Sequence, residues 1–333
     1  MKIWITGIAG FLGGHLADAL LADGHEVWGN DNGICCDMTH SKWSRLDCCD
    51  FDAMKKALET FKPYVVVHCA ATAHEGLSSF SPSFITRNIF EASVSTFSAA
   101  IASGVKRIVF MSSMARYGHG YGYCQPPFDE SMPPAPCDPY GVAKVAAEEV
   151  LKILSKTHDV ECSILVPHSI IGLRQKYTDP ARNVASIMIN RCLSGQPPII
   201  YGDGLQKRCF SPVSDCLPSI IKAVHGEADG HVVNIGPDGG EITIKELAEK
   251  IMKLTNYTND PEYFPDRVNE VKNAYCSSDK VRRLLGFEQK QSLDDCLAEM
   301  VNDIKLLGPK PFDYFFPIEI EEGCPKTWLQ KMI

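Results

Sequence analysis

Tyr140 and Lys144 are the two side chains whose types and spacing most clearly suggest chemistry. They lie in the stretch Asp138-Pro-Tyr-Gly-Val-Ala-Lys144, and residues four apart share one face of a helix. An unperturbed tyrosine titrates near ~10, and an adjacent ammonium group favours the phenolate and lowers its pKa. We therefore predict that this pair exchanges a proton with a substrate hydroxyl. The alternative is a solvated helix face that carries a tyrosine and a lysine by chance.

A glycine-rich turn at the start of the chain predicts a dinucleotide site. An apolar strand pattern at Lys2–Thr6 runs directly into glycines with a three-residue spacing, and a helical pattern follows. Such glycines permit a sharp turn, close approach of a pyrophosphate and close packing of the helix against the strand. The helix N-terminus then presents its free amide groups to the phosphates. The residues expected to hold the dinucleotide here are Gly7, Gly10, Phe11, Leu12 and Gly13.

The second strand pattern, Glu26–Asp31, ends in an acid 18 residues beyond Gly13. A carboxylate at this place accepts hydrogen bonds from the adenosine ribose and repels a 2′-phosphate, so NAD is expected rather than NADP. The alternative is an exposed aspartate in a turn. Ser44–Asp47 predicts a third strand, with Asp47 placed to meet the adenine.

Strand and helix patterns then alternate, which predicts a parallel, doubly wound sheet of the Rossmann type. The continuous apolar run Pro63–Ala71 is typical of a strand buried on both faces, and small alanines at its end leave room for a cofactor. Ligands of such sheets bind at the carboxyl ends of strands, where Ser113 falls. The remaining expected elements are a long amphipathic helix between Pro82 and Gly104, a strand at Val105–Ser113, a helix from Tyr140 to about Lys156 and a strand at Val160–Val166.

After Gly172 the pattern changes to longer loops rich in proline and glycine, which predicts a smaller α/β substrate-binding lobe. We expect an NAD-binding domain over residues 1–172, to which residues 211–240 return with a strand at Gly230–Gly236. The smaller lobe is expected over 173–210 and 241–308. The last segment, 309–333, is expected to be a tail that packs on the body.

Composition excludes several classes of function. The 333 residues exceed what one core usually needs, and a net charge of -8 without basic runs disfavours nucleic-acid or anionic-membrane binding. The N-terminus enters a strand pattern directly, and no apolar run approaches the ~20 residues of a membrane span, so we predict a cytoplasmic protein. The fourteen cysteines are expected as thiols, and the doublets Cys35-Cys36 and Cys48-Cys49 lack the spacing of a zinc site, so no metal is expected.

Taken in order, Thr6–Gly13, Asp31, Ser113 and Tyr140–Lys144 resemble the extended short-chain dehydrogenase/reductase family over residues 1 to about 305. Within that family the chain is similar to the nucleotide-sugar 4-epimerases. The segments that carry this similarity are Tyr201–Arg208 and Arg267–Glu270, which match those that hold the nucleotide diphosphate. The resemblance implies the family's fold, tightly held NAD and a homodimer.

The same resemblance implies roles for individual residues. Ser113 would hydrogen-bond the reacting sugar oxygen, Tyr140 would be the acid/base, and Lys144 would grip the nicotinamide ribose. Further NAD contacts are expected from Asn32, Cys48, Ala70, Ala71, Asn88 and Pro167. Substrate contacts are expected from His74, Glu75, Ser113, Met114, Arg116, Ser169, Tyr201, Arg208, Arg267, Glu270 and Ala274. For His74 and Glu75 the alternative is that they only cap a loop.

Two positions after Ser113 distinguish reactions within the family. Sugar-nucleotide 4,6-dehydratases carry an Asp-Glu pair there and decarboxylases a Glu, whereas this chain has Met114 and Ala115. We therefore expect that no carboxylic acid drives dehydration. The 3,5-epimerases place a cysteine at the position of Ala115, so that reaction is disfavoured as well.

The expected reaction is epimerisation at carbon 4 of a UDP-hexose. Tyr140 takes the proton of the 4-hydroxyl while hydride passes to NAD, and the resulting 4-keto sugar turns its other face before hydride returns. Arg208 and Arg267 hold the diphosphate meanwhile, because bidentate arginine contacts to phosphate are strong. The alternatives are an oxidoreductase with net NAD turnover and a non-catalytic NAD-binding scaffold.

Two residues bear on the choice of sugar. In the resembling epimerases a bulky aromatic residue seven positions beyond the arginine excludes N-acetyl groups, and here Ala274 follows Arg267 at that distance. We therefore expect a UDP-N-acetylhexosamine to be accepted along with, or instead of, UDP-glucose and UDP-galactose. Alternatively, Arg116 pairs with the carboxylate of UDP-glucuronate, or it is only an outward-facing surface arginine.

Overall fold

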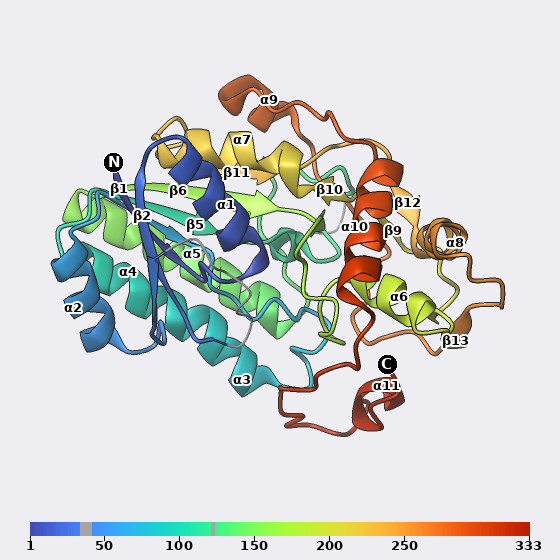
Figure 1. Ribbon diagram of the computed structural model, residues 1–333. Helices are drawn as coiled ribbons and strands as arrows, with labels where there is room; N and C mark the ends of the chain where they lie inside the picture. Colours follow the sequence, from blue (N-terminus) through green and yellow to red (C-terminus); the bar gives the residue numbers. More distant parts are fainter. Residues whose placement is uncertain (34–41, 121–123) are drawn as a thin grey trace.

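The computed structural model describes residues 1–33, 42–120 and 124–333 (Figure 1). The Cys35-Cys36 doublet lies outside these described residues. The main sheet contains β1 (Lys2–Thr6), β2 (Glu26–Asp31), β3 (Lys42–Arg45), β4 (Val65–His68), β5 (Arg107–Met111), β6 (Glu161–Pro167) and β11 (Val232–Ile235). Its order is β11-β6-β5-β4-β1-β2-β3, and every neighbouring pair is parallel. The predicted parallel, doubly wound sheet is therefore confirmed.

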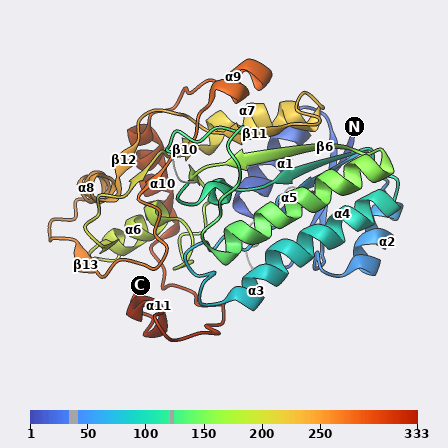
Figure 2. The same ribbon diagram turned by 180° about the vertical axis from the view of Figure 1, so that it is seen from behind.

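Helices cover both faces of this sheet, and Figures 1 and 2 show the two layers from opposite sides. One layer contains α1 (Phe11–Ala22), α7 (Val213–Val224) and α9 (Asp279–Leu285), and the other contains α2 (Phe51–Phe61), α4 (Ala92–Ala102) and α5 (Pro139–His158). Successive side chains of a strand point to opposite faces. Accordingly, Ile3 and Ile5 join the core under α1 and α7, whereas Trp4 joins the core under α2, α4 and α5.

Two expected elements differ in detail from the structure. Strand β3 ends before Asp47, because the Asp47 side chain starts a turn by accepting a hydrogen bond from the Cys49 N–H at 2.9 Å. The single long helix expected after Pro82 is divided into α3 (Pro82–Thr86), a π-helical turn η1 (Arg87–Glu91) and α4. The turn occurs at Asn88, whose side-chain amide donates to the Phe84 carbonyl at 2.7 Å.

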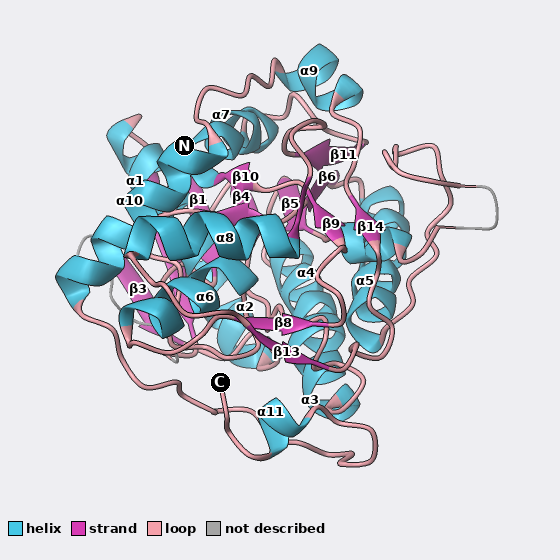
Figure 3. Cartoon of the chain, turned by 90° about the vertical axis from the view of Figure 1, so that its right-hand side faces the viewer, coloured by secondary structure: helices cyan, strands magenta, loops and turns pink. Residues whose placement is uncertain are grey.

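A third core, separate from the two cores of the main sheet, forms the smaller lobe at the carboxyl end of the sheet (Figure 3). Its helices are α6 (Val184–Leu193), α8 (Ile244–Thr255) and α10 (Leu293–Leu307). Its strands are β8 (Ile199–Tyr201) with β13 (Glu262–Phe264), and β12 (Ile242–Thr243), β9 (Lys207–Arg208) and β14 (Asn273–Ala274). A short parallel pair joins β7 (Ile170–Ile171), which follows β6 along the chain, to β10 (Ser211–Pro212), which follows β9. The exact domain boundaries stay a prediction.

The C-terminal segment 309–333 packs against the body of the protein and contains the short helix α11 (Lys326–Leu329). Phe316 and Trp328 of this segment form an apolar cluster with Leu77 and Phe80 from the loop after β4. The tail therefore joins the lobe to the segment that follows the central strand.

The surface of α4 and α5 bears on the expected homodimer. Val142 is 53% exposed and Ile153 is 63% exposed, which leaves apolar side chains of α5 in contact with solvent in a single chain. Phe97, in contrast, is fully buried under the sheet and is not available for pairing. The homodimer stays a prediction.

Within the described parts of the chain, no helix is long and apolar enough to cross a membrane. The cysteines described there are free. No group of three histidine, cysteine or acidic side chains that could hold a metal occurs among those residues.

The last residue of β4 is a buried histidine, His68, whose titration makes the core sensitive to pH. The His68 ring lies with Nδ1 2.7 Å from the Thr6 hydroxyl and Nε2 3.0 Å from the Ser93 hydroxyl, which itself donates to the Ile89 carbonyl. A neutral ring satisfies this chain of hydrogen bonds. Burial, and then the nearby charge of Lys144, lowers the pKa of His68 to about 3.

We expect His68 to make the fold sensitive to acid. The unfolded chain takes up a proton on this histidine below about pH 6.5, whereas the folded chain does so only near pH 3, so its stabilisation is present above pH 6.5 and is lost as pH falls. Lowering the pH from 7 to 5 should remove about 2 kcal/mol of unfolding free energy through this residue. Urea titrations at both pH values should show a smaller pH effect in His68→Asn, while the exposed control His158→Asn keeps the wild-type dependence. An unchanged dependence in His68→Asn would contradict the assignment.

Candidate active site

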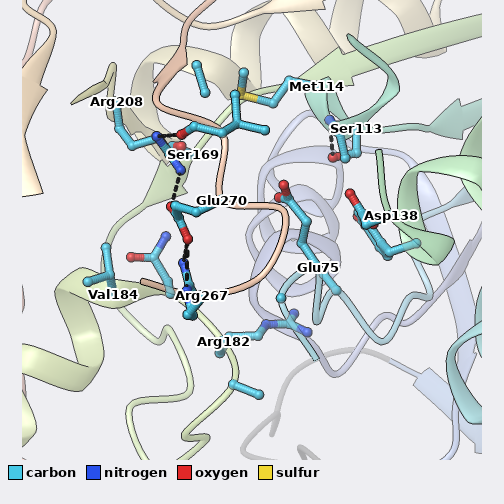
Figure 4. Close-up of a pocket in the computed structure, with 18 of the residues that line it drawn as sticks. Glu75, Ser113, Met114, Asp138, Ser169, Arg182, Val184, Arg208, Arg267 and Glu270 are labelled. Atoms are coloured by element: carbon cyan, nitrogen blue, oxygen red, sulfur yellow. Dashed lines mark hydrogen bonds and ion pairs between the residues drawn. The ribbon is translucent and has the colours of Figure 1, made fainter. Parts of the chain in front are cut away.

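A cavity of about 390 Å³ lies between the carboxyl ends of the main strands and the smaller lobe. Figure 4 shows part of its wall. The predicted residues that line it are Phe11, Leu12, Ala71, Glu75, Ser113, Met114, Tyr140, Lys144, Pro167, Ser169, Tyr201, Arg208, Arg267, Glu270 and Ala274. The fold therefore gathers residues from seven separate stretches of the sequence around one space.

Helix α5 delivers Tyr140 and Lys144 to this space. The helix begins at Pro139, and the Asp138 carboxylate caps it by accepting a hydrogen bond from the Gly141 N–H at 2.9 Å. An aspartate cap followed by a proline at the first helical position is a common helix start. Tyr140 and Lys144 follow within the first two turns, and both side chains are buried.

The charge state of Tyr140 differs from the expectation. Burial raises the pKa of Tyr140, and a hydrogen bond with Ser113 offsets this only in part. Lys144 does not approach the phenol closely enough to reverse the effect: its Nζ lies 5.9 Å from the ring centre and donates to the Met111 carbonyl at 2.7 Å. Burial also lowers the pKa of Lys144 to about 8. The expected lowering of the tyrosine pKa is therefore wrong for the protein without ligands, where Tyr140 is protonated at neutral pH.

Ser113 follows β5 and lines the cavity together with Tyr140. Its hydroxyl also accepts a hydrogen bond from the Ala115 N–H at 3.2 Å, which starts the short 3-10 helix η2 (Met114–Tyr117). The serine is thus held by its own backbone and placed beside the phenol. The pair can donate to or accept from one oxygen atom of a ligand.

The glycine turn after β1 fits a dinucleotide. Gly7 has a φ of +67°, and a Cβ on Gly13 would lie 2.2 Å from the Gly7 carbonyl oxygen, so side chains are excluded at both places. Gly10 precedes α1 without any side-chain cap, and the first turn of α1 contains no acid. The amide groups at this helix start are therefore free for a pyrophosphate.

Asp31 ends β2 beside this turn, as expected for a ribose ligand. Its Oδ1 accepts a hydrogen bond from the Gly33 N–H at 3.0 Å. Burial raises the pKa of this carboxyl, and backbone hydrogen bonds from Gly33, Ala9 and Asn32 oppose that effect. Asn32 follows directly, at the rim of the same turn.

The other residues expected to contact NAD lie outside the cavity lining, and several of them bond to other groups of the protein. The Ala70 N–H donates to the Thr6 hydroxyl at 3.2 Å. Cys48 is buried, with its Sγ 3.3 Å from the Asn30 side-chain amide. The Asp47 carboxylate lies 3.2 Å from Arg87, and Asn88 bonds within its own helix. Contacts of these residues with NAD remain predictions.

Two arginines of the lobe share one carboxylate. The Glu270 Oε1 lies 2.6 Å from an Arg208 amino group, and its Oε2 accepts from the Arg267 Nε at 2.8 Å (Figure 4). Burial alone would raise the pKa of Glu270, but the two guanidinium groups hold it below its ordinary value. The Arg267 guanidinium also lies 5.1 Å from the Tyr201 ring centre. This arrangement fixes two cations and an aromatic ring on one wall, with Ala274 paired to Arg208 in the strand register.

Two predicted substrate residues lie elsewhere. Arg116 does not line the cavity, because its guanidinium is buried 3.1 Å from the Glu148 carboxylate under α5. It is neither a surface arginine nor a free partner for a uronate. His74 is also fully buried, with its Nε2 2.8 Å from Asp179 and its ring against Phe316. It joins two loops behind the cavity wall, whereas Glu75 next to it enters the cavity.

Among the lining residues that sequence reasoning missed, three belong to the connection before α6 or to the tail. Arg182 precedes α6, and its charge lowers the pKa of Tyr140 in part. Trp328 and Ile333 belong to the tail, which closes one side of the cavity. No motif or spacing marks these positions, because the long connections that bring them here carry no periodic pattern.

Known proteins resemble this chain along most of its length. A profile of the NAD dependent epimerase/dehydratase family matches residues 3–236. The UDP-glucose 4-epimerase of Mycolicibacterium smegmatis is 30% identical over 311 residues, which cover 90% of this chain and 97% of that protein.

Solved structures resemble the whole fold. The UDP-glucose 4-epimerase of Thermotoga maritima with UDP-glucose has a TM-score of 0.86 at 28% identity, covering 92% of this chain and 99% of that one. The UDP-glucuronic acid 4-epimerase of Bacillus cereus, in complex with UDP-glucuronic acid and NAD, has a TM-score of 0.82 at 26% identity, covering 92% and 100%.

Asp31 should set the choice of dinucleotide. Its charge repels a 2′-phosphate, so we expect the wild-type protein to bind NAD at least about tenfold more tightly than NADP. Asp31→Asn should narrow this ratio, and the exposed control Asp23→Asn at the end of α1 should not. Calorimetric titration measures all three. Equal affinities of the wild type for NAD and NADP would show that the assignment is wrong.

Proposed function

Because this chain belongs to the NAD dependent epimerase/dehydratase family, we propose that it epimerises a UDP-hexose at carbon 4 through a 4-keto intermediate. The observation that carries the proposal is that Ser113 and Tyr140 line one cavity whose lobe side holds Arg208 and Arg267. One part of the cavity offers proton transfer at a single oxygen, and the other offers two cations to a diphosphate. A nucleotide sugar needs both.

NAD is the family's cofactor, and when bound it takes the hydrogen of carbon 4 with its electron pair and returns it. Ser113 and Tyr140 hold the 4-oxygen of the sugar between them. Tyr140 accepts the hydroxyl proton as the ketone forms and gives it back as the ketone is reduced. Lys144 lies next to the tyrosine and contributes a cation that burial has partly desolvated. Its charge favours the phenolate once the tyrosine gives up its proton.

Arg208 and Arg267 anchor the diphosphate of the substrate. Glu270 holds both guanidinium groups in place before a ligand arrives, so little side-chain entropy is lost on binding the diphosphate. Binding energy concentrated on the nucleotide leaves the hexose loosely held. A loosely held 4-keto hexose can present either face to the cofactor, as epimerisation requires.

Other reactions receive less support. Met114, directly after Ser113, offers a thioether that neither donates nor removes a proton, so the strand that carries the serine has no acid for dehydration or decarboxylation. The burial of Arg116 against Glu148 removes the proposed partner of a uronate carboxylate. An oxidoreductase with net turnover would release NAD in each cycle. Retention of NAD through purification, without added cofactor, would separate the two cases.

Ala274 bears on the sugar. It lines the cavity, is paired to Arg208 in the strand register, and leaves space that a larger side chain would fill. We propose that this space accepts a 2-acetamido group. The substrate is then a UDP-N-acetylhexosamine along with, or instead of, UDP-glucose and UDP-galactose.

Tyr140→Phe should abolish turnover while the fold and NAD binding remain. The substitution removes one hydroxyl from the reacting centre, and loss of a general acid–base group costs on the order of 100-fold or more in rate. The matched control is Tyr177→Phe, which removes a buried hydroxyl bonded to the Gly308 carbonyl away from the cavity's reacting end. NMR of purified protein with UDP-sugars measures the rates. Activity of Tyr140→Phe within tenfold of wild type would refute the role.

Ala274→Tyr should separate the candidate sugars. The larger side chain fills volume that only the N-acetyl substrate needs, so turnover of UDP-N-acetylglucosamine should fall at least about tenfold more than that of UDP-glucose. Both rates are measured on the same preparation by NMR. Equal losses on the two substrates would mean that Ala274 does not set specificity.

A further inference from the structure

Glu75 places a carboxylate inside the cavity that the proposed reaction does not use. The residue lies in the loop after β4, and Figure 4 shows its side chain between the Ser113 and Asp138 side and the wall of Arg208, Glu270 and Arg267. In the described part of the chain, no side chain or backbone group bonds to this carboxylate. Only the backbone carbonyl of Glu75 has a partner, the Ser78 N–H and hydroxyl.

The other two acids that line the cavity, Asp138 and Glu270, already bond to the protein. Asp138 caps α5, and Glu270 holds the two arginines. Glu75, in contrast, is open to the cavity interior while protein surrounds the cavity. Its backbone is fixed on both sides, by the buried His74 that bonds Asp179 and by the fully buried Leu77. The carboxylate is therefore held in the cavity by the packing of its neighbours.

The groups that face Glu75 keep it ready to exchange a proton. The Glu75 side chain is accessible to solvent within the cavity. The protein packed around the cavity, and then the negative charge of Asp138, raises the pKa of Glu75 to about 7, while Arg208 and Arg267 oppose the shift and Glu270 adds to it. Glu75 also acts on Tyr140, whose pKa it helps to raise. A carboxyl with a pKa near the working pH, within electrostatic reach of the reacting tyrosine, is suited to general acid–base work.

We propose that Glu75 is a second acid–base residue, which exchanges the hydrogen of a carbon next to the 4-ketone, carbon 3 or carbon 5, with solvent. The inference rests on the proposed function, which supplies the ketone. The C–H bond breaks and its proton passes to the Glu75 carboxylate, while the electron pair forms an enolate with its charge on the 4-oxygen. Ser113 and Tyr140 stabilise that charge by hydrogen bonds. Return of a proton from Glu75 restores the ketone, so the step needs no oxidant or reductant.

The position of Glu75 makes this step independent of the residues that follow Ser113. Met114 and Ala115 leave that strand without an acid, but Glu75 reaches the same cavity from the loop after the neighbouring strand β4. The expectation that no acid drives dehydration concerns the two positions after Ser113, and Glu75 lies outside them. A carboxylate is present, and it comes from a different stretch of the chain.

The test supplies the ketone directly. Purified protein in D₂O is given a UDP-4-keto-6-deoxyhexose, and NMR follows the hydrogens on carbons 3 and 5. The wild type should incorporate deuterium at one of these carbons well above the rate in buffer, and Glu75→Gln should lower that rate at least about 100-fold. Glu75→Asp should exchange faster than Glu75→Gln, and the exposed tail control Glu322→Gln should match the wild type.

Calorimetric titration with UDP shows whether each variant still forms the nucleotide site. Wild-type exchange no faster than buffer, or equal exchange in wild type and Glu75→Gln when both bind UDP, would overturn the proposal. Because the ketone is supplied, the result does not depend on oxidation at carbon 4. Deuterium exchange without interconversion of UDP-sugars would therefore reject the proposed function and leave the role of Glu75 standing.

Discussion

The candidate site depends on one hydrogen-bonded junction at the start of α5. The Asp138 carboxylate accepts from the Gly141 N–H, and the Ser78 hydroxyl lies 3.2 Å from the same oxygen and 2.7 Å from the Glu75 carbonyl. A helix cap of this kind contributes about 0.5–2 kcal/mol. Here it also joins two walls of the cavity, because α5 carries the tyrosine and the Ser78 turn carries Glu75. The relative position of Tyr140 and Glu75 is thus set by the cap of one helix.

Much of the fold could be predicted because its signals are local. The bounds expected for β1 and β2 agree with the structure, since a buried strand between a glycine turn and a polar turn has clear ends. Gly7 and Gly13 are required because a Cβ at either position would clash with nearby backbone atoms. Tyr140 and Lys144 share a helix face for the same reason: helical geometry follows from residue spacing alone.

The parts that could not be predicted depend on contacts between distant segments. Arg116 lies three residues beyond Ser113, yet it does not line the cavity. Its guanidinium forms a buried ion pair with Glu148 of α5 instead. Adjacent residues His74 and Glu75 face opposite ways, one into the protein and one into the cavity. The charge state of Tyr140 is set by its burial, which outweighs the nearby lysine. None of these outcomes leaves a pattern in the sequence around the residue concerned.

The tail gives one side of the cavity an unusual origin. Trp328 and Ile333 line the cavity, and the Tyr201 hydroxyl lies 2.6 Å from the Thr327 hydroxyl. During synthesis on a ribosome, the other residues that line the cavity emerge before Trp328 and Ile333, so this side of the pocket forms after the rest. Because Ile333 lines the cavity, an affinity tag fused after it would begin at the cavity. A tag fused before Met1 would begin at the amino end of β1, away from the cavity. The position of a purification tag is therefore a choice about the binding site.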